Sequence, residues 1–119
     1  MCIRDRTEAT TGLLGREALR RLKPGAVLVN TARGPIVDEE ALTDALRSGR
    51  LAAAGLDVFA VEPVPENNPL LNLPNVVLTP HVTWYTADTM SRYLELAVDN
   101  CVRLRDGRDL ANVVNQVAG

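Results

Sequence analysis

Three side chains of the kinds that move protons and bind anions each follow a short apolar run of the sequence: Arg33, Glu62 and His81. His81 is the only histidine in the 119 residues. An imidazole, with a pKa of about 6.5, exchanges a proton at cellular pH, and a carboxylate bonded to its other nitrogen would orient it. An arginine offers a planar fork of donors to a carboxylate or a polarised carbonyl oxygen. Together such groups suit the protonation of a carbonyl while a hydride arrives from the other side.

Each of these residues also has a simpler explanation. Arg33 could be a solvated loop charge, and Glu62 could be a turn residue in front of Pro63. Asp57, near the end of the second apolar run, could be an ordinary carboxylate that accepts backbone hydrogen bonds. His81 could be a polar residue in a turn. Spacing along the chain does not bring side chains together, so the choice depends on the elements that position them.

The composition is that of one small globular domain, with 46% hydrophobic residues, 24% charged residues and a net charge of -2. This charge balance predicts neither a nucleic-acid partner nor binding to an anionic membrane. No apolar run approaches the roughly 20 residues of a membrane helix, and residues 1–6 contain no signal-peptide core. Cys2 and Cys101 have no metal or redox spacing, so we expect reduced thiols, no metal site and a cytoplasmic location.

Short apolar runs alternate with helical patterns, and Pro or Gly marks each change. The run at 26–30 lacks polar alternation, which predicts a strand covered on both faces. Asp38 is a natural N-cap, and Gly49 is placed to end the helix that Asp38 begins. Strands that alternate with helices predict an α/β fold with a parallel sheet. The expected elements are a helix at 16–23, strands at 26–30, 52–59 and 76–79, a helix between Asp38 and Gly49, connectors from 62 and at 70–74, and a long helix from Thr86 to Gly107.

The three candidate side chains all fall where a predicted strand ends. In open parallel sheets, ligands bind beyond the carboxyl ends of the strands. Arg33 follows the first strand, Glu62 the second and His81 the third. We therefore expect them to converge at one edge of the sheet.

Three stretches of the sequence, NTARGPIVDEEAL, GLDVFAVEP and LPNVVLTPH, resemble consecutive signatures of the D-isomer-specific 2-hydroxyacid dehydrogenases. The resemblance extends from Thr7 to about Asn115. It implies a partial Rossmann-type doubly wound parallel sheet, of which only the second half is present, followed by a long C-terminal helix.

The resemblance also implies roles for the matching residues. Arg33 would bind the carboxylate and carbonyl oxygen of a small 2-oxo acid. Glu62 would orient His81, which would be the general acid in reduction and the general base in oxidation of the 2-hydroxy acid. Thr83 departs from the His-x-Gly/Ala pattern most common in the family. Trp84 resembles members that act on glycerate and hydroxypyruvate, although a packing role explains it equally well.

The cofactor that the resemblance implies is NAD or NADP. Thr31, Ala32 and Arg33 would approach its nicotinamide half together with His81. Asp57 would hold the carboxamide and so set which face of the ring offers the hydride. The family's G-x-G-x-x-G turn, which seats the pyrophosphate, is absent from the sequence.

Most of the family's substrate domain also has no counterpart in these residues. We therefore expect residues 1–6 to be a non-native remnant, residues 7–85 to be the second half of a dinucleotide-binding domain, and residues 86–119 to be a helix and tail that return to the substrate domain. The full-length protein would be a homodimer, and the isolated chain would lack turnover. The alternatives are an NAD-sensing, corepressor-like protein of the same fold and an inactive truncated subunit.

Overall fold

The computed structural model describes residues 6–113. The chain divides into two compact units, residues 1–83 and 84–119. Residues 1–5 of the expected remnant lie outside the described residues, so the expectation for that segment stays a prediction. The first unit contains the sheet and all the side chains expected to act together, and it is described first.

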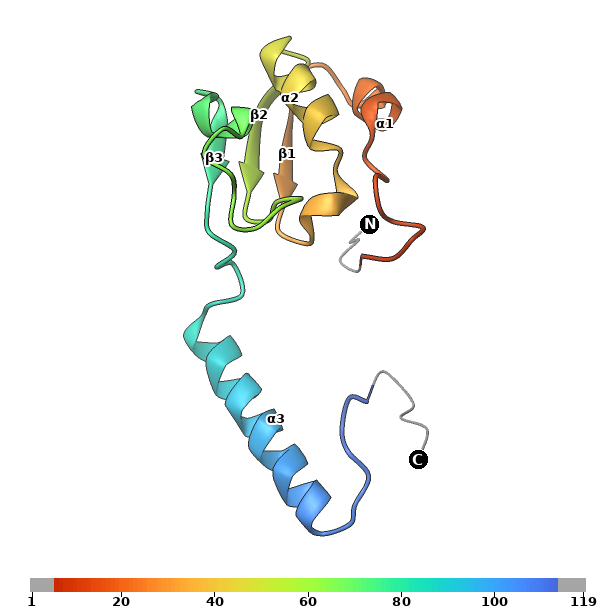
Figure 1. Ribbon diagram of the computed structural model, residues 1–119, viewed down its shortest axis with the longest axis vertical. Coiled ribbons are helices and arrows are strands. Elements are labelled where there is room, and N and C mark those ends of the chain that lie inside the picture. Colours follow the sequence, from red (N-terminus) through yellow and green to blue (C-terminus); the bar gives the residue numbers. More distant parts are fainter. Residues whose placement is uncertain (1–5, 114–119) are drawn as a thin grey trace. The chain divides into compact units, whose positions relative to one another are not determined.

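The first unit is built on a parallel sheet of three strands, β1 (Ala26–Asn30), β2 (Leu51–Leu56) and β3 (Val76–Leu78), in the order β1-β2-β3 (Figure 1). The register aligns Asn30 with Leu56 and Leu56 with Leu78. The three strands therefore end level with one another, and the segments that follow them start from the same edge. This confirms the expected α/β class and places the candidate side chains on one rim.

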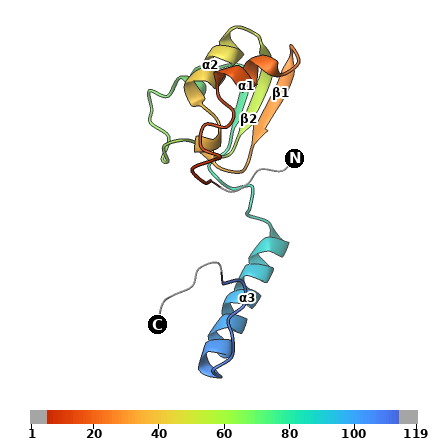
Figure 2. The same ribbon diagram turned by 90° about the vertical axis from the view of Figure 1, so that its right-hand side faces the viewer.

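Two helices, α1 (Arg16–Arg21) and α2 (Glu39–Arg47), cover one face of the sheet (Figure 2). The side chain of Asp38 caps α2 by accepting a hydrogen bond from the Ala41 N–H at 3.0 Å, as expected of an N-cap. The left-handed backbone of Gly49 (φ 72°) follows the end of α2. The core between helices and sheet is formed mainly by Leu19, Leu28, Leu42, Leu46, Leu51, Leu56, Phe59 and Leu70.

The other face of the sheet is bare within the described residues of the first unit. Val27, Val29 and Val77 are 64%, 69% and 70% exposed. The prediction that the first strand is covered on both faces is therefore wrong within this unit, because its two helices pack on one side of the sheet. An apolar run without polar alternation shows that both faces avoid water, but it does not show that the covering layer belongs to the same segment.

Element ends differ from the predictions for local reasons. The first helix ends at Arg21, and Leu22 after it is extended (ψ 155°). Pro24 disfavours helical backbone at Lys23, the residue directly before it, so the helix cannot readily continue. The second strand ends at Leu56, three residues before its predicted end. The next residue, Asp57, directs its side chain to the segment after β3, where it accepts from the Val82 N–H. Two short 3-10 helices are also present: η1 (Gly34–Ile36), where no element was predicted, and η2 (Pro69–Asn72), which overlaps the connector expected at 70–74.

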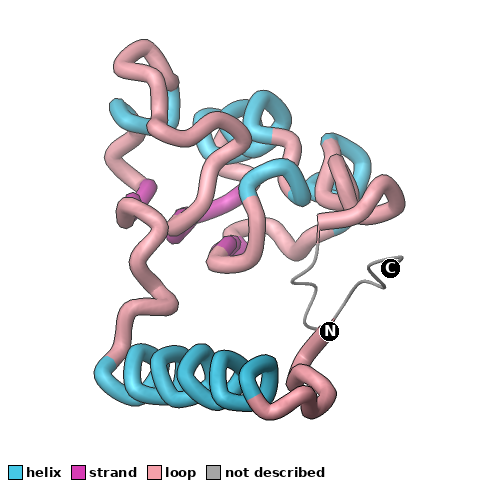
Figure 3. The backbone as a smooth tube through the Cα atoms, turned by 60° about the horizontal axis from the view of Figure 1, so that its bottom comes forward, coloured by secondary structure: helices cyan, strands magenta, loops and turns pink. Residues whose placement is uncertain are grey.

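Among its described residues, 84–113, the second unit has one helix, α3 (Ala87–Arg105), close to its predicted bounds (Figure 3). Thr86 caps it by accepting from the Thr89 N–H at 3.2 Å. The chain after α3 turns back beside it, since Ala111 exchanges hydrogen bonds of 2.8 and 3.2 Å with the side chain of Asn100 (Figure 1). None of the residues of α3 is buried, so its apolar stripe has no cover within this unit.

Candidate active site

The loop after β1 is shaped by the buried side chain of Asn30. Its amide accepts from the Ala32 N–H at 3.1 Å and donates to the Arg33 carbonyl at 3.0 Å. These two bonds close a tight turn and leave Thr31 and Arg33 exposed at its tip. Asn30 was predicted only as a strand residue, and nothing in the sequence distinguishes it from an ordinary loop asparagine.

Gly34 brings this loop against the segment after β2. A Cβ atom at position 34 would lie 1.9 Å from the carbonyl carbon of Phe59 and 2.5 Å from the Ala60 nitrogen. Such contacts are impossible, so only glycine allows the two backbones to approach this closely. Gly34 therefore determines how near Arg33 can come to the residues of the second loop.

The loop after β2 is held by two carboxylates. Glu62 accepts from the Phe59 N–H at 2.9 Å through one oxygen. Glu39, in the first turn of α2, accepts from the Ala60 N–H through one oxygen and from the Asn68 amide at 3.2 Å through the other. The bond from Glu39 to this loop was not predicted from the sequence.

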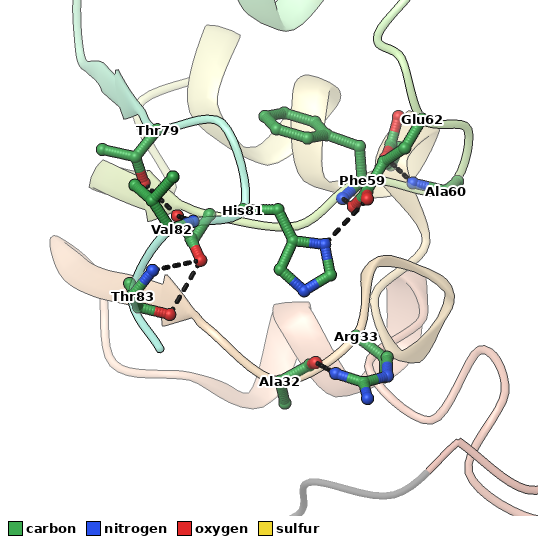
Figure 4. A network of polar contacts seen from close by, with 11 residues as sticks. Ala32, Arg33, Phe59, Ala60, Glu62, Thr79, His81, Val82 and Thr83 are labelled. Atoms are coloured by element: carbon green, nitrogen blue, oxygen red, sulfur yellow. Dashed lines mark hydrogen bonds and ion pairs between the residues drawn. The ribbon is translucent and has the colours of Figure 1, made fainter. Parts of the chain in front are cut away.

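Glu62 and His81 form the polar pair that the spacing suggested. The second oxygen of Glu62 lies 2.8 Å from Nδ1 of His81, and the two side chains are 36% and 40% exposed (Figure 4). The hydrogen bond from His81 and the one from the Phe59 N–H hold the pKa of Glu62 below its usual range. An ionised Glu62 fixes the proton on Nδ1, so Nε2 is the nitrogen that can give or take a proton. In Figure 4 Nε2 points toward the side on which Ala32 and Arg33 lie.

Asp57 is buried behind this pair. Its oxygens accept from the Thr79 hydroxyl at 2.6 Å, the Val82 N–H at 2.8 Å, the Thr83 N–H at 3.0 Å and the Thr83 hydroxyl at 2.7 Å. Burial alone would raise the pKa of Asp57, but these bonds outweigh burial and hold it far below its usual range. The simpler explanation considered for Asp57, a strand-end carboxylate that accepts backbone hydrogen bonds, describes part of what it does.

Arg33 is exposed, and its guanidinium donates to the carbonyl of Ala32 at 2.7 Å. The structure thus joins Glu62 to His81 and places Arg33 on the neighbouring loop, with its side chain folded back on its own backbone. An open cavity of about 570 Å³ lies beside the pair, lined by Phe59, Glu62, Pro63, Val64, Pro80 and His81. A proton-transfer pair at an apolar cavity, with a guanidinium on the adjacent loop, is an arrangement suited to a small polar substrate.

The family model of the D-isomer specific 2-hydroxyacid dehydrogenase NAD binding domain matches residues 1–83. The chain belongs to this family. A glyoxylate reductase of Korarchaeum cryptofilum is 48% identical over 110 residues, and glyoxylate/hydroxypyruvate reductase B of Pectobacterium atrosepticum is 49% identical over 109. Each alignment covers 92% of this chain, which spans only about a third of either relative, 33% and 34%.

A solved 2-hydroxyacid dehydrogenase supports the same assignment. The D-isomer specific 2-hydroxyacid dehydrogenase of Xanthobacter autotrophicus Py2, in complex with NADPH and MES, superposes with a TM-score of 0.80 at 43% identity. The superposition covers 92% of this chain and 45% of that one. The expected family and the Rossmann-type parallel sheet are confirmed.

Two other structural features bear on the predicted class of protein. Among residues 6–113, no helix is both long and apolar enough to cross a membrane. Within the same residues, no group of three or more His, Cys, Asp or Glu side chains is placed to hold a metal ion.

Proposed function

We propose that this chain supplies the proton-transfer part of the active site of an NAD(P)-dependent D-2-hydroxyacid dehydrogenase that reduces a small 2-oxo acid of the glyoxylate or hydroxypyruvate kind. The observation that carries this proposal is the hydrogen bond of 2.8 Å between Glu62 and Nδ1 of His81. The names of the two similar reductases support the substrate class. Each of these alignments covers 92% of this chain.

The proposed roles follow from the geometry of the side chains. His81 would donate the Nε2 proton to the carbonyl oxygen in reduction and remove it from the hydroxyl in oxidation. Glu62 would hold the ring and stabilise its positive charge. Arg33 would leave the Ala32 carbonyl and present its fork to the substrate carboxylate. The nicotinamide cofactor supplies or accepts the hydride when it is bound.

The loop after β1 suits the nicotinamide end of the cofactor. Thr31 and Arg33 are exposed at the turn that Asn30 closes, with the half-buried Ala32 between them. We assign Thr31, Ala32, Arg33 and His81 to contacts with NAD or NADP. We do not assign Asp57 to the carboxamide of the cofactor, because all its strong acceptor positions are used within the chain.

The share of the relatives that this chain covers supports its action as part of a longer subunit. We propose that residues 7–85 complete a dinucleotide-binding domain and that residues 86–119 return to a substrate domain in a cytoplasmic homodimer. The bare valines of the sheet and the uncovered stripe of α3 are the surfaces that such a subunit would cover.

The test joins residues 7–119 to the preceding two thirds of the Pectobacterium atrosepticum enzyme and measures reduction of glyoxylate, hydroxypyruvate and pyruvate with NADH and NADPH. Turnover by this hybrid that falls by about 10²-fold to 10⁴-fold in the His81→Ala variant is the expected result. A His81→Ala variant with full turnover would refute the assigned role. Binding of NAD without turnover in the unsubstituted hybrid would favour the NAD-sensing alternative.

A further inference from the structure

Asp57 is the most completely satisfied side chain of the site. It is only 2% exposed. An ionised carboxylate has about four lone-pair positions, and the four hydrogen bonds from Thr79, Val82 and Thr83 supply one donor for each. All four donors come from the short segment that contains His81 and from no other part of the described chain.

The backbone of His81 needs to be held. Its φ angle is 56°, in the left-handed region that residues with a side chain adopt at a cost. A residue stays in that region only when its surroundings impose it. One oxygen of Asp57 bonds Thr79 before His81 and Val82 after it, so it spans the bend directly.

The ring of His81 is held from a different direction. Glu62 reaches it from the loop after β2 and is fixed in turn by the Phe59 N–H. The two carboxylates therefore hold different parts of His81. Asp57 fixes the backbone on either side of this residue, and Glu62 forms a hydrogen bond with its ring. A change in the backbone at His81 would move the ring away from Glu62, even though neither member of that pair had been altered.

We propose that Asp57 is a positioning residue for His81 and that the hydrogen bond from the Thr83 hydroxyl is needed for Asp57 to hold the loop in place. The proposal rests on the proposed role of His81, and it deepens that role. Direct binding of a carboxamide N–H by Asp57 would need a strong acceptor position that the Thr83 hydroxyl occupies at 2.7 Å. Thr83 is also the position at which this chain departs from the family pattern of glycine or alanine.

The test is the protonation of the His81 ring in the 119-residue chain, in which this histidine has no others to overlap with it. Long-range ¹H–¹⁵N spectra, recorded at about pH 8, report which ring nitrogen carries the proton. The unsubstituted chain is expected to carry it on Nδ1. Thr83→Val removes the hydroxyl while keeping the shape and the backbone N–H. We expect this variant to lose most of the Nδ1 preference.

Two variants control this measurement. Thr83→Ser restores a hydroxyl and is expected to restore the Nδ1 proton. Thr11→Ala removes an exposed hydroxyl that donates to the Thr7 carbonyl at 2.9 Å, outside the site, and is expected to change nothing at His81. If Thr83→Val proved unfolded by circular dichroism, Asp57→Asn would be measured instead, with the same loss expected. A folded Thr83→Val or Asp57→Asn chain that kept the full Nδ1 preference would overturn the proposal.

The hybrid enzyme gives a second readout that separates positioning from direct cofactor binding. Positioning predicts that Thr83→Val lowers kcat by about tenfold, a fraction of what the acid itself contributes, with the KM for NADH unchanged. Direct binding predicts a changed KM for NADH with the His81 ring unaltered, and that result would overturn the proposal. Since the spectra need neither cofactor nor substrate, absence of turnover in every hybrid would count against the proposed function and not against the role of Asp57.

Discussion

The sharpest structural prediction concerns Gly34, where one added methyl group should separate the two loops of the site. A Cβ at this position would lie 1.9 Å from the Phe59 carbonyl carbon, against the 3.0 Å that real Cβ atoms essentially never go below. The backbones must therefore move apart by at least 1.1 Å (3.0 minus 1.9). Because both sides of the contact are backbone, no rotamer change can absorb this movement.

The size of the effect follows from that displacement. Overpacking of a well-packed region costs typically about 1 to 3 kcal/mol, and we expect Gly34→Ala to lie near the upper end. A misplacement of about 1 Å in a catalytic group can cost roughly 10²-fold in rate. Gly34→Ala should therefore lower both the free energy of unfolding of the 119-residue chain and the kcat of the hybrid enzyme.

Gly55 in β2 provides a matched control. A Cβ there would meet only the Val29 side chain, at an ordinary 3.8 Å. Since glycine inside a strand is about 0.5 to 1 kcal/mol less favourable than alanine, Gly55→Ala should leave stability unchanged or raise it slightly. Urea unfolding followed by circular dichroism measures both variants. Equal stabilities for Gly34→Ala and the unsubstituted chain would refute the close approach of the loops.

The remaining predictions concern pH and the start of α2. The pKa values of Asp57 and Glu62 are lowered on folding, so the unfolded chain binds more protons in acid, and the free energy of unfolding should rise with pH below about 5 and then level off. Urea midpoints at about pH 3 and pH 6 test this sign, and Asp57→Asn should flatten the rise; a midpoint higher at the acid pH would contradict it. Asp38→Ala removes the N-cap of α2 and should lower the free energy of unfolding by about 1 kcal/mol. The control Asp106→Ala, at the C-terminal end of α3, should lower it by less. Equal losses of stability in the two variants would exclude the cap as the cause.

The position of the active-site edge could be predicted from the sequence, because parallel strands bring their carboxyl ends together whatever the loops do. That rule sufficed to place Arg33, Glu62 and His81 on one rim. The helices α2 and α3 were predicted from local features instead, the N-cap Asp38 for α2 and the helical pattern from Thr86 to Gly107 for α3. Element type followed from periodicity, and only the ends shifted by a few residues.

The supports of the site could not be predicted in this way. The amide of Asn30, the bond from Glu39 to the Ala60 N–H and the closeness of Gly34 to Phe59 each depend on how two loops meet. Nothing local to one segment encodes such a meeting. The exposure of the valines on β1 was missed for a related reason, since an apolar strand does not specify which segment covers it.

The level strand ends of the sheet have a consequence for any attempt to redesign this protein. Side chains alternate between the two faces along a strand. Deleting one residue within β2 would therefore move every side chain beyond the deletion to the opposite face of the sheet. The loops should tolerate substitutions more readily, provided that the three strands still end level with one another. The sheet thus sets the starting points of all three loops, and none of its strands can be lengthened or shortened by a single residue without changing them.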